Sequence, residues 1–407
     1  MDRPQRWISF MSWVPAVAMF VAACGPAPSA APTSAPAQAA KPAEAAKPVE
    51  AAKPADVAKP ATGSSGGDWQ TAFQQTVEAA KKEKLVIVSM PGENDKKIME
   101  MFKEAYPGIE VEHTGARPSD ISPKIISEQQ NGVYAWDVFE STGASNMHEV
   151  LLPAGAFQDL PEYIVDPSIM DDSKWRNGKW ATYSSSTKPQ ILSHDFSLRN
   201  GLYINRDVIP ASELNTLDDL MNPKYQGKIV VDDCTVAAQG TSTIIGLWQA
   251  KGPDWVRKLF VDQKPVFQET VRVTSEWVAT GRYPIGIGPA DQELVRLQAE
   301  GIGKNVEPLE YGGGNVSASG VAIFKNAPHP NAAKVFVNWF LSQEGQSAWT
   351  KAHNNPPARN SRRSDVPLND PKGVPDYNNL GQYFIWGTET GTDTVKAILA
   401  MCKELRP

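Results

Sequence analysis

Apolar side chains recur along this chain at two spacings, one typical of helices and one typical of buried strands. Trp69, Phe73 and Val77 stand four residues apart, which predicts an amphipathic helix. The continuous apolar run at 85–88 then predicts a buried parallel strand, and a Pro91-Gly92 turn follows it. The rest of this first series comprises a helix carrying Ile98, Phe102 and Ala105 that ends at Pro107-Gly108, a strand at 109–113, a helix at 122–130 and a strand at 137–140.

A second series of the same kind follows later in the chain. It comprises a strand at 228–231, a helix at 241–250, a helix opened by Gly252-Pro253, a strand at 283–287 and a helix at 291–300 that Gly301 ends. Strands that alternate with helices predict open α/β sheets, whose ligands bind at the carboxyl ends of the strands. Two such series, separated by an extended segment at 202–205, predict an α/β protein of two lobes with a cleft between them.

The N-terminus has the pattern of an export signal. Arg3 and Arg6 precede an apolar stretch at 7–22, and small residues lead to Cys24. A membrane-spanning helix is the alternative, but the stretch is shorter than the ~20 apolar residues that a span needs, and serines and a proline interrupt it. The approach to Cys24 resembles the bacterial lipoprotein signal, which implies a signal peptide at 1–23 and a lipid anchor on the Cys24 thiol.

The segment 24–67 is dominated by Ala, Pro, Lys and Glu. A six-residue pattern repeats in it as AAKPAE, AAKPVE, AAKPAD and VAKPAT. Such a composition buries too little apolar surface to offset its ordering entropy, and its prolines favour extended polyproline II at ~3.1 Å per residue. We therefore expect a disordered, semi-rigid tether between the anchor and the folded region.

Composition narrows the function classes. The chain of 407 residues has 40 Lys and Arg against 46 Asp and Glu, with a formal net charge of −6, which argues against nucleic acid as a partner. The region from residue 68 onward is long enough for two lobes. Beyond Cys24, the cysteines are Cys234 and Cys402, and the sequence leaves open whether they form a disulfide or stay free thiols.

Several segments resemble one known family. They are AYPGIEVEHTGARPSD, WDVFESTG, LYINRDVIP, the run from Asn222 to Lys228, and APHPNAAKVFVNWFLSQEGQ. They are similar to the extracellular solute-binding proteins of ABC importers, in the group that includes ferric-ion, thiamine, phosphonate and polyamine binders.

The resemblance implies the type II periplasmic binding protein fold, with a ligand cleft between two lobes. It implies a first lobe at 68–200 and 306–345, a second lobe at 201–305, and a C-terminal segment at 346–407 that packs on the lobes. The expected partners are a small-molecule ligand and an ABC permease in the cytoplasmic membrane. We expect an exported monomer at the outer face of that membrane or in the periplasm, without a cofactor.

The last of these segments has a structural interpretation. Asn331 is placed to cap a helix after Pro330, and Val335, Phe336, Trp339 and Phe340 form one apolar stripe at helical spacing. This stripe favours core packing over ligand contact.

Ligand contacts are expected where strands end and helices begin, because free backbone N–H groups there attract polar atoms. Trp180, Tyr183 and Tyr203, near the crossover between the lobes, are further candidates for stacking, although each is better explained by packing. The main candidates are Glu93 and Asn94 after the first strand, Arg117 and Ser119 after the second, Ser141 and Thr142 after the third, and Asp232, Asp233, Gly240, Thr241, Ser242 and Asp291 in the second lobe.

An enzyme is not expected, because the chain has no G-x-S-x-G, H-E-x-x-H, C-x-x-C or G-x-x-x-x-G-K-[ST] motif. The alternatives from other classes are an extracellular carbohydrate-active hydrolase, which the 12 tryptophans would suit, and a structural lipoprotein.

The solute is predicted from the residues at these strand ends. Ferric binders of the family use two adjacent tyrosines after the strand equivalent to 283–287, whereas this chain has Gly288, Pro289, Ala290, Asp291 and Gln292 there. We therefore expect no bound ferric ion and no metal, and favour a small anionic or other polar solute held by Arg117 and hydroxyl groups. The acids Asp232, Asp233 and Asp291 favour the alternatives, a polyamine or a metal held by oxygen ligands.

Overall fold

The computed structural model describes residues 68–142, 144, 146–176, 178, 189–236, 238–311, 314–355, 358–386 and 391–406. All of them belong to one compact unit. The predicted signal peptide, Cys24, the tether, Trp180 and Tyr183 lie outside the described residues.

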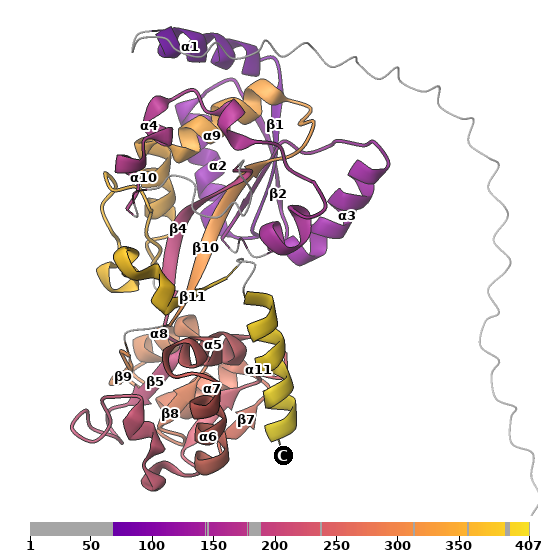
Figure 1. Ribbon diagram of the computed structural model, residues 1–407. Coiled ribbons are helices and arrows are strands. Elements are labelled where there is room, and N and C mark those ends of the chain that lie inside the picture. Colours follow the sequence, from indigo (N-terminus) through magenta and orange to yellow (C-terminus); the bar gives the residue numbers. More distant parts are fainter. Residues whose placement is uncertain are drawn as a thin grey trace, which may run out of the picture. The chain divides into compact units, whose positions relative to one another are not determined.

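The first sheet has the strand order β11-β10-β3-β1-β2, and β4 also pairs with β10 (Figure 1). The strands β1, β2 and β3 are parallel, whereas β10 runs antiparallel to β3 and β4. Leu85 and Ile87 of β1 enter the core on one face and Val88 enters the core on the other, as the pleat requires. The bounds are β1 (Lys84–Ser89), β2 (Glu110–Gly115), β3 (Val138–Ser141), β4 (Ile191–Arg199), β10 (Gly314–Ile323) and β11 (Tyr383–Ile385).

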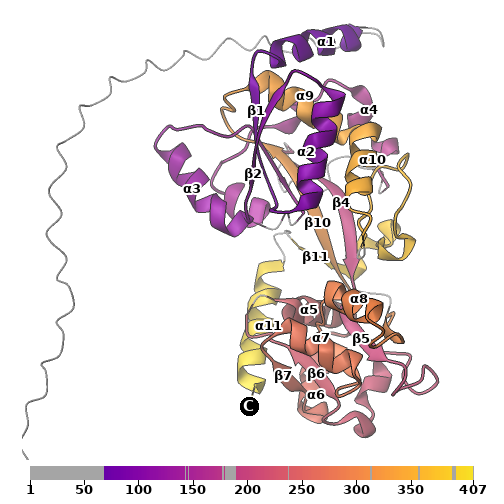
Figure 2. The ribbon, with the colours of Figure 1, turned by 180° about the vertical axis from the view of Figure 1, so that it is seen from behind.

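Helices cover both faces of this sheet. One face packs with α2, α9 and α10, with α1 lying on α9, and the other face packs with α3 (Figures 1 and 2). The bounds are α1 (Asp68–Ala80), α2 (Glu93–Ala105), α3 (Pro118–Gln130), α4 (Pro167–Met170), α9 (Pro330–Leu341) and α10 (Gln343–Ala352).

The second sheet has the order β7-β6-β8-β5-β9. Its core has the same two-sided form, because Ile229 and Val231 of β6 pack with α5 and α6 while Val230 packs with α7 and α8. The bounds are β5 (Leu202–Asn205), β6 (Ile229–Asp232), β7 (Val266–Gln268), β8 (Ile285–Ile287), β9 (Val306–Pro308), α5 (Gln239–Lys251), α6 (Pro253–Gln263), α7 (Val271–Ala279), α8 (Asp291–Ala299) and α11 (Gly391–Leu405). Short helical turns lie at Met147–Leu151, Leu160–Tyr163, Asp172–Lys174, Asp218–Met221, Pro223–Tyr225, Pro371–Gly373 and Tyr377–Gln382.

The helices and strands predicted in the two α/β series are present, with ends shifted by a few residues. The interpretation of α9 is confirmed for its apolar stripe, which is buried, but it is wrong for the cap. His329 occupies the cap position, and the carboxylate of Glu83 accepts the N–H groups of Asn331 and Ala332 at 3.0 Å each. A charged acceptor, here from the turn between α1 and β1, suits the positive helix end better than the short amide does.

The chain crosses between the two sheets from β4 to β5, from β9 to β10, and from β11 to α11. At the first crossing Gly201 has a φ of 69°, and an added Cβ would lie 2.0 Å from the hydroxyl of Thr243. Asn315 of β10 donates to the carbonyls of Arg199 at 3.1 Å and Ser242 at 2.9 Å, so it ties α5 to the first sheet. The lobe boundaries inferred from the resemblance stay predictions.

A disulfide joins Cys234, which follows β6, to Cys402 of α11. This settles the alternative that the sequence left open. The bond fixes α11 to the second sheet, where α11 packs against α5 and α6 (Figure 2).

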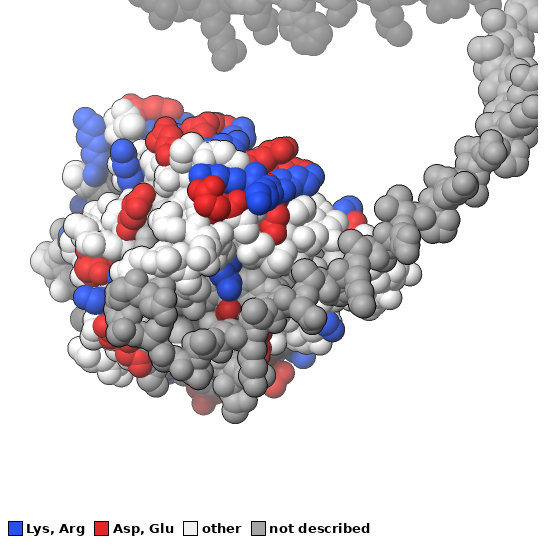
Figure 3. All heavy atoms as spheres, turned by 90° about the horizontal axis from the view of Figure 1, so that it is seen from above, with Lys and Arg blue, Asp and Glu red and all other residues white. Residues whose placement is uncertain are grey.

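On the face shown in Figure 3, acidic and basic side chains are interspersed rather than gathered by sign. Within the part of the chain that the structure describes, no helix is both long and apolar enough to cross a membrane.

Candidate ligand-binding site

A cavity of about 710 Å³ lies where the two sheets approach each other, and both contribute to its walls. Its polar wall residues from the first sheet and the segment after α10 are Thr142, Asn315, Ser317 and Arg359. Arg199 lies at the crossing, and Trp386 follows β11. The second sheet and its helices contribute Asp232, Asp233, Gln239, Ser242, Glu269, Asp291 and Gln292.

Four carboxylates line the wall that the second sheet provides. Asp232 ends β6 and Asp233 follows it, while Glu269 follows β7 and Asp291 begins α8. The parallel register of β6 and β7 places Asp232 opposite Gln268, so all of the first three carboxylates leave the same edge of the sheet.

Asp232 is the most deeply buried of these acids, with 3% of its surface exposed. The N–H of Gly240 donates to its Oδ2 at 3.2 Å, whereas its Oδ1 has no hydrogen-bond partner among the described residues. Burial raises the pKa of Asp232 to about 6, against the opposing effect of the Gly240 N–H. A buried carboxylate without a basic partner favours a cation that reaches it from the cavity.

The two arginines that line the cavity are already engaged by carboxylates. Arg199 contacts Asp291 at 2.8 Å, and the hydroxyl of Tyr203 donates to the other oxygen of Asp291 at 2.7 Å. Arg359 contacts Asp195 at 2.8 Å and also donates to the carbonyl of Thr142 and the hydroxyl of Ser319. Although burial alone would raise the pKa of Asp195, Arg359 holds it below its usual range.

Behind the first-sheet wall lies a buried group of two acids and a histidine: Asp95, Glu140 and His194. Burial raises the pKa of Asp95 to about 8, and the charge of Glu140 adds to the effect. Burial also raises the pKa of Glu140 to about 7, and it lowers the pKa of His194 to about 3. His194 is therefore neutral, and its Nε2 lies 3.2 Å from Glu140, while Asp95 keeps its proton and hydrogen-bonds Glu140.

The structure brings together only some of the residues that the sequence singles out. Thr142, Asp232, Asp233, Ser242 and Asp291 line the cavity. Beside it, Gly240 holds Asp232, and the buried Thr241 hydroxyl donates to the carbonyl of Val236 at 2.5 Å.

The other predicted contacts lie outside this cavity lining. Arg117 and Ser119 are exposed at the start of α3, and Ser119 donates to Asp120. Glu93 is exposed and pairs with Lys96 at 2.7 Å, with Asn94 beside it. Ser141 is buried at the end of β3. That these residues contact the ligand stays a prediction.

Sequence reasoning missed Arg199, Asn315, Glu269 and Arg359. Glu269 follows a strand, β7, that is too short to show an apolar pattern. Arg199 ends β4, just before the chain crosses into the second sheet. This position next to the expected cleft is the sequence feature that could have identified it. Arg359 lies in a polar segment whose burial nothing in the sequence indicates.

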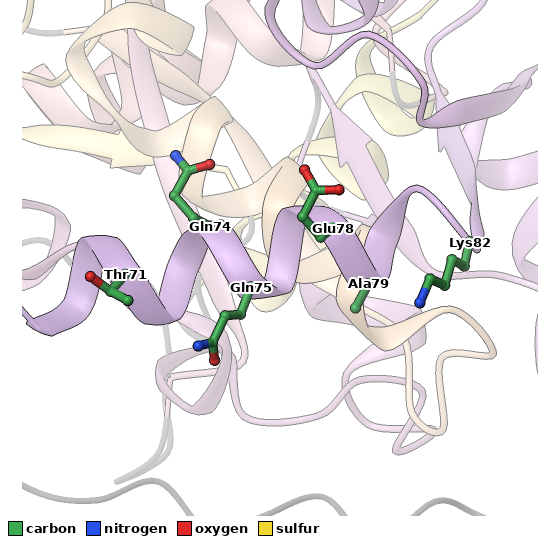
Figure 4. A pocket seen from close by; sticks show the side chains of 6 residues that line it. All are labelled: Thr71, Gln74, Gln75, Glu78, Ala79 and Lys82. Atoms are coloured by element: carbon green, nitrogen blue, oxygen red, sulfur yellow. The ribbon is translucent and has the colours of Figure 1, made fainter.

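A second hollow, of about 420 Å³, lies along α1 and is lined by Thr71, Gln74, Gln75, Glu78, Ala79 and Lys82 (Figure 4). Figure 4 shows Gln74 and Glu78 pointing to one side of the helix and Gln75 to the other. Because these side chains come from one helix and its end and do not converge, they form no binding site. The described residues contain no group of three or more His, Cys, Asp or Glu placed to hold a metal ion.

Two α/β sheets, joined by crossing strands and sharing a polar cavity, define a two-lobed periplasmic binding protein fold. The sequence matches the bacterial extracellular solute-binding protein family over residues 97–376. The chain therefore belongs to that family. It is a bacterial extracellular solute-binding protein, as its sequence predicts.

Similar proteins agree with this assignment. Iron uptake protein A2 of Synechocystis is 24% identical over 262 residues, which cover 56% of this chain and 68% of that protein. Iron uptake protein A1 of the same organism is 20% identical, covering 51% of this chain and 61% of its own length.

Among solved structures, a Trichodesmium protein in complex with iron and citrate ligands has a TM-score of 0.59 at 20% identity, covering 79% of this chain and 99% of that one. The Bordetella ferric binding protein has a TM-score of 0.58 at 15% identity, and the match covers 79% of this chain and 99% of that one. These likenesses establish the two-lobed fold. The family and the similar structures are solute-binding proteins rather than enzymes.

Proposed function

We propose that this chain is a lipid-anchored binding subunit that captures a small organic cation, such as a primary amine, for an ABC importer. The observation that supports the cation is Asp232, a buried carboxylate that lines the cavity and has no basic partner among the described residues. A protonated amine in the cavity would supply the positive charge that balances this carboxylate.

An anion fits the cavity less well. Both arginines of the lining are paired with carboxylates, and Arg117, on which the anionic alternative depends, is exposed and outside the cavity lining. An anion entering beside four carboxylates would meet like charge, and neither arginine of the described lining is free to offset it.

A ferric ion is the alternative that the names of the relatives favour. A hard ferric ion prefers several anionic oxygens at one point. Of the loop after β8, only Asp291 carries a carboxylate, and Arg199 and Tyr203 already engage it. The organic cation therefore remains the better match to the described wall.

Calorimetric titration tests the cation directly. We expect butylamine, at pH 7.5, to bind the wild-type protein, and Asp232→Asn to weaken that binding at least tenfold because the charged partner is gone. The matched comparison is Arg117→Ala, which removes a charge outside the cavity lining and is expected to leave amine affinity unchanged. Citrate binding that Arg117→Ala abolishes would support an anionic solute instead, and a tyrosinate-to-iron absorption band with ferric citrate would support iron.

The anchor is proposed from the small residues before Cys24 and the Ala/Pro/Lys segment after it. Cys24→Ser should leave the exported protein unlipidated, so that it partitions into the aqueous phase of a detergent phase separation. Unchanged partitioning into the detergent phase would contradict the anchor, and it would not affect the ligand proposal.

A further inference from the structure

Residues 391–406, which comprise α11 and Arg406 and are called the C-terminal arm below, are fastened to the second sheet beside the cavity. The disulfide from Cys402 reaches Cys234, two residues after Asp232. Arg257 of α6 adds a paired contact to Glu404 at 2.8 and 2.9 Å. The arm is therefore held at two points close to the acidic wall.

The disulfide sets where Arg406 lies. Arg406 follows Cys402 by one helical turn, and its N–H donates to the Cys402 carbonyl at 2.9 Å. Its guanidinium reaches Asp233 at 3.7 Å and donates to the carboxylate of Glu269. Both of these acids line the cavity.

Asp233 and Glu269 are neighbours because of the sheet. The N–H of Asp233 donates to the carbonyl of Gln268 at 2.9 Å, which continues the pairing of β6 with β7. Both acids therefore leave the same edge of the sheet on adjacent strands, and like charges placed there repel each other unless a cation offsets them. Arg406 provides that cation from within the chain.

We infer that Arg406 is a specificity-determining residue, which supplies the cation for two acids of the cavity wall and so restricts the ligand to a single positive charge at Asp232. This inference rests on the proposed function. Asp291 is neutralised by Arg199 in the same way, so Asp232 is the wall carboxylate left to a ligand among the described residues. The second ammonium of a diamine bound at Asp232 would meet Asp233 and Glu269, whose charge Arg406 already offsets.

Replacing Arg406 should therefore change selectivity rather than remove binding. In Arg406→Gln, Asp233 and Glu269 lose their internal cation, and a second ligand ammonium can take its place. We expect 1,4-diaminobutane to bind this variant at least tenfold more tightly than it binds the wild-type protein, while the affinity for butylamine changes less than threefold. Arg406→Lys keeps the charge and should retain the wild-type preference.

The matched control is Arg257→Gln, which removes the contact of the same arm through Glu404 but replaces neither Arg406 nor a residue of the cavity lining. Titration of both amines into all four proteins separates the outcomes. An unchanged ratio of diamine to monoamine affinity in Arg406→Gln would overturn the inference while leaving the proposed function intact, and so would an equal gain in Arg257→Gln. If the wild-type protein binds neither amine, the proposed function fails and the inference fails with it.

Discussion

At the scale of single residues, Asp232 should make ligand binding depend on pH. Burial raises the pKa of Asp232 to about 6, so below that pH the Asp232 side chain is protonated and neutral in most molecules. Since a proton and a cationic ligand compete for the same carboxylate, affinity for butylamine should be full near pH 7.5 and about tenfold lower at pH 5. Titration calorimetry at the two pH values measures this change, and Asp232→Asn should show none of it. A wild-type affinity that is constant across this range would contradict the assignment.

The buried pair Asp95 and Glu140 should affect stability in the opposite sense from a typical surface acid. Both pKa values are raised, to about 8 and about 7, so the native state holds protons that the unfolded chain releases near pH 4. Stability from this pair is therefore present at low pH and is lost as pH rises toward 8. Asp95→Asn keeps the hydrogen-bond donor without the titration, so it should raise the free energy of unfolding at pH 8 by about 1–3 kcal/mol and change it little at pH 5.

Urea unfolding at both pH values tests this, with Glu93→Gln as the control. Glu93 lies two residues away at the exposed start of the same helix and pairs only with Lys96 among the described contacts, so its change should be small at either pH. If the free energy of unfolding changed equally with pH in the wild-type protein and in Asp95→Asn, this pair would not be the source of the pH dependence of stability.

The site residues that sequence reasoning found are those at the ends of parallel strands. Asp232, Asp233 and Asp291 could be predicted because apolar strands can be recognised in a sequence. The carboxyl ends of parallel strands meet at one edge of the sheet, where ligands bind. Arg359 and Arg406 could not be predicted in this way. Each reaches the wall from a distant segment, through partners that only the folded chain brings together.

At the scale of elements, the start of α5 depends on a glycine that permits close approach. A Cβ on Gly240 would lie 1.9 Å from the carbonyl oxygen of Asp232, and the backbone of Gly240 also packs against Gly288. Gly240→Ala must push α5 away from the end of β6, which we expect to cost about 1–3 kcal/mol of stability and to weaken amine binding. The comparison is Gly381→Ala, where an added Cβ meets nothing within 4 Å. Equal unfolding midpoints for the two variants would contradict this account of the helix start.

The long strands β4 and β10 show why part of the fold escapes prediction from sequence. Their interiors bury Ser193, His194, Asp195 and Ser319, which break the apolar pattern that marks a core strand. Arg359 donates to the side chains of Asp195 and Ser319, and Arg362 donates to the backbone carbonyl of Ser193; both arginines lie far along the chain. The apolar pattern of one strand gives no information about an arginine partner from a distant segment.

At the scale of the whole molecule, binding is expected to bring the two sheets together around the ligand. Both contribute walls to the same cavity, and three chain crossings join them. With a saturating amine, small-angle scattering should show a smaller radius of gyration, and unfolding should shift by about 2.7 kcal/mol at a hundred times the dissociation constant. Asp232→Asn under the same conditions should show neither effect. A thermal shift without compaction would mean that the ligand binds an already closed molecule.

The disulfide also has a consequence for the order in which the protein matures. Cys402 follows Cys234 by 168 residues, so a chain translocated from its N-terminus exposes the first thiol long before the second. Until the pair forms, which requires an oxidising compartment, Arg406 is not fastened beside Asp233 and Glu269. The wall of the cavity would then reach its final charge only after export, and a precursor still in the cytoplasm would lack the selectivity of the mature protein.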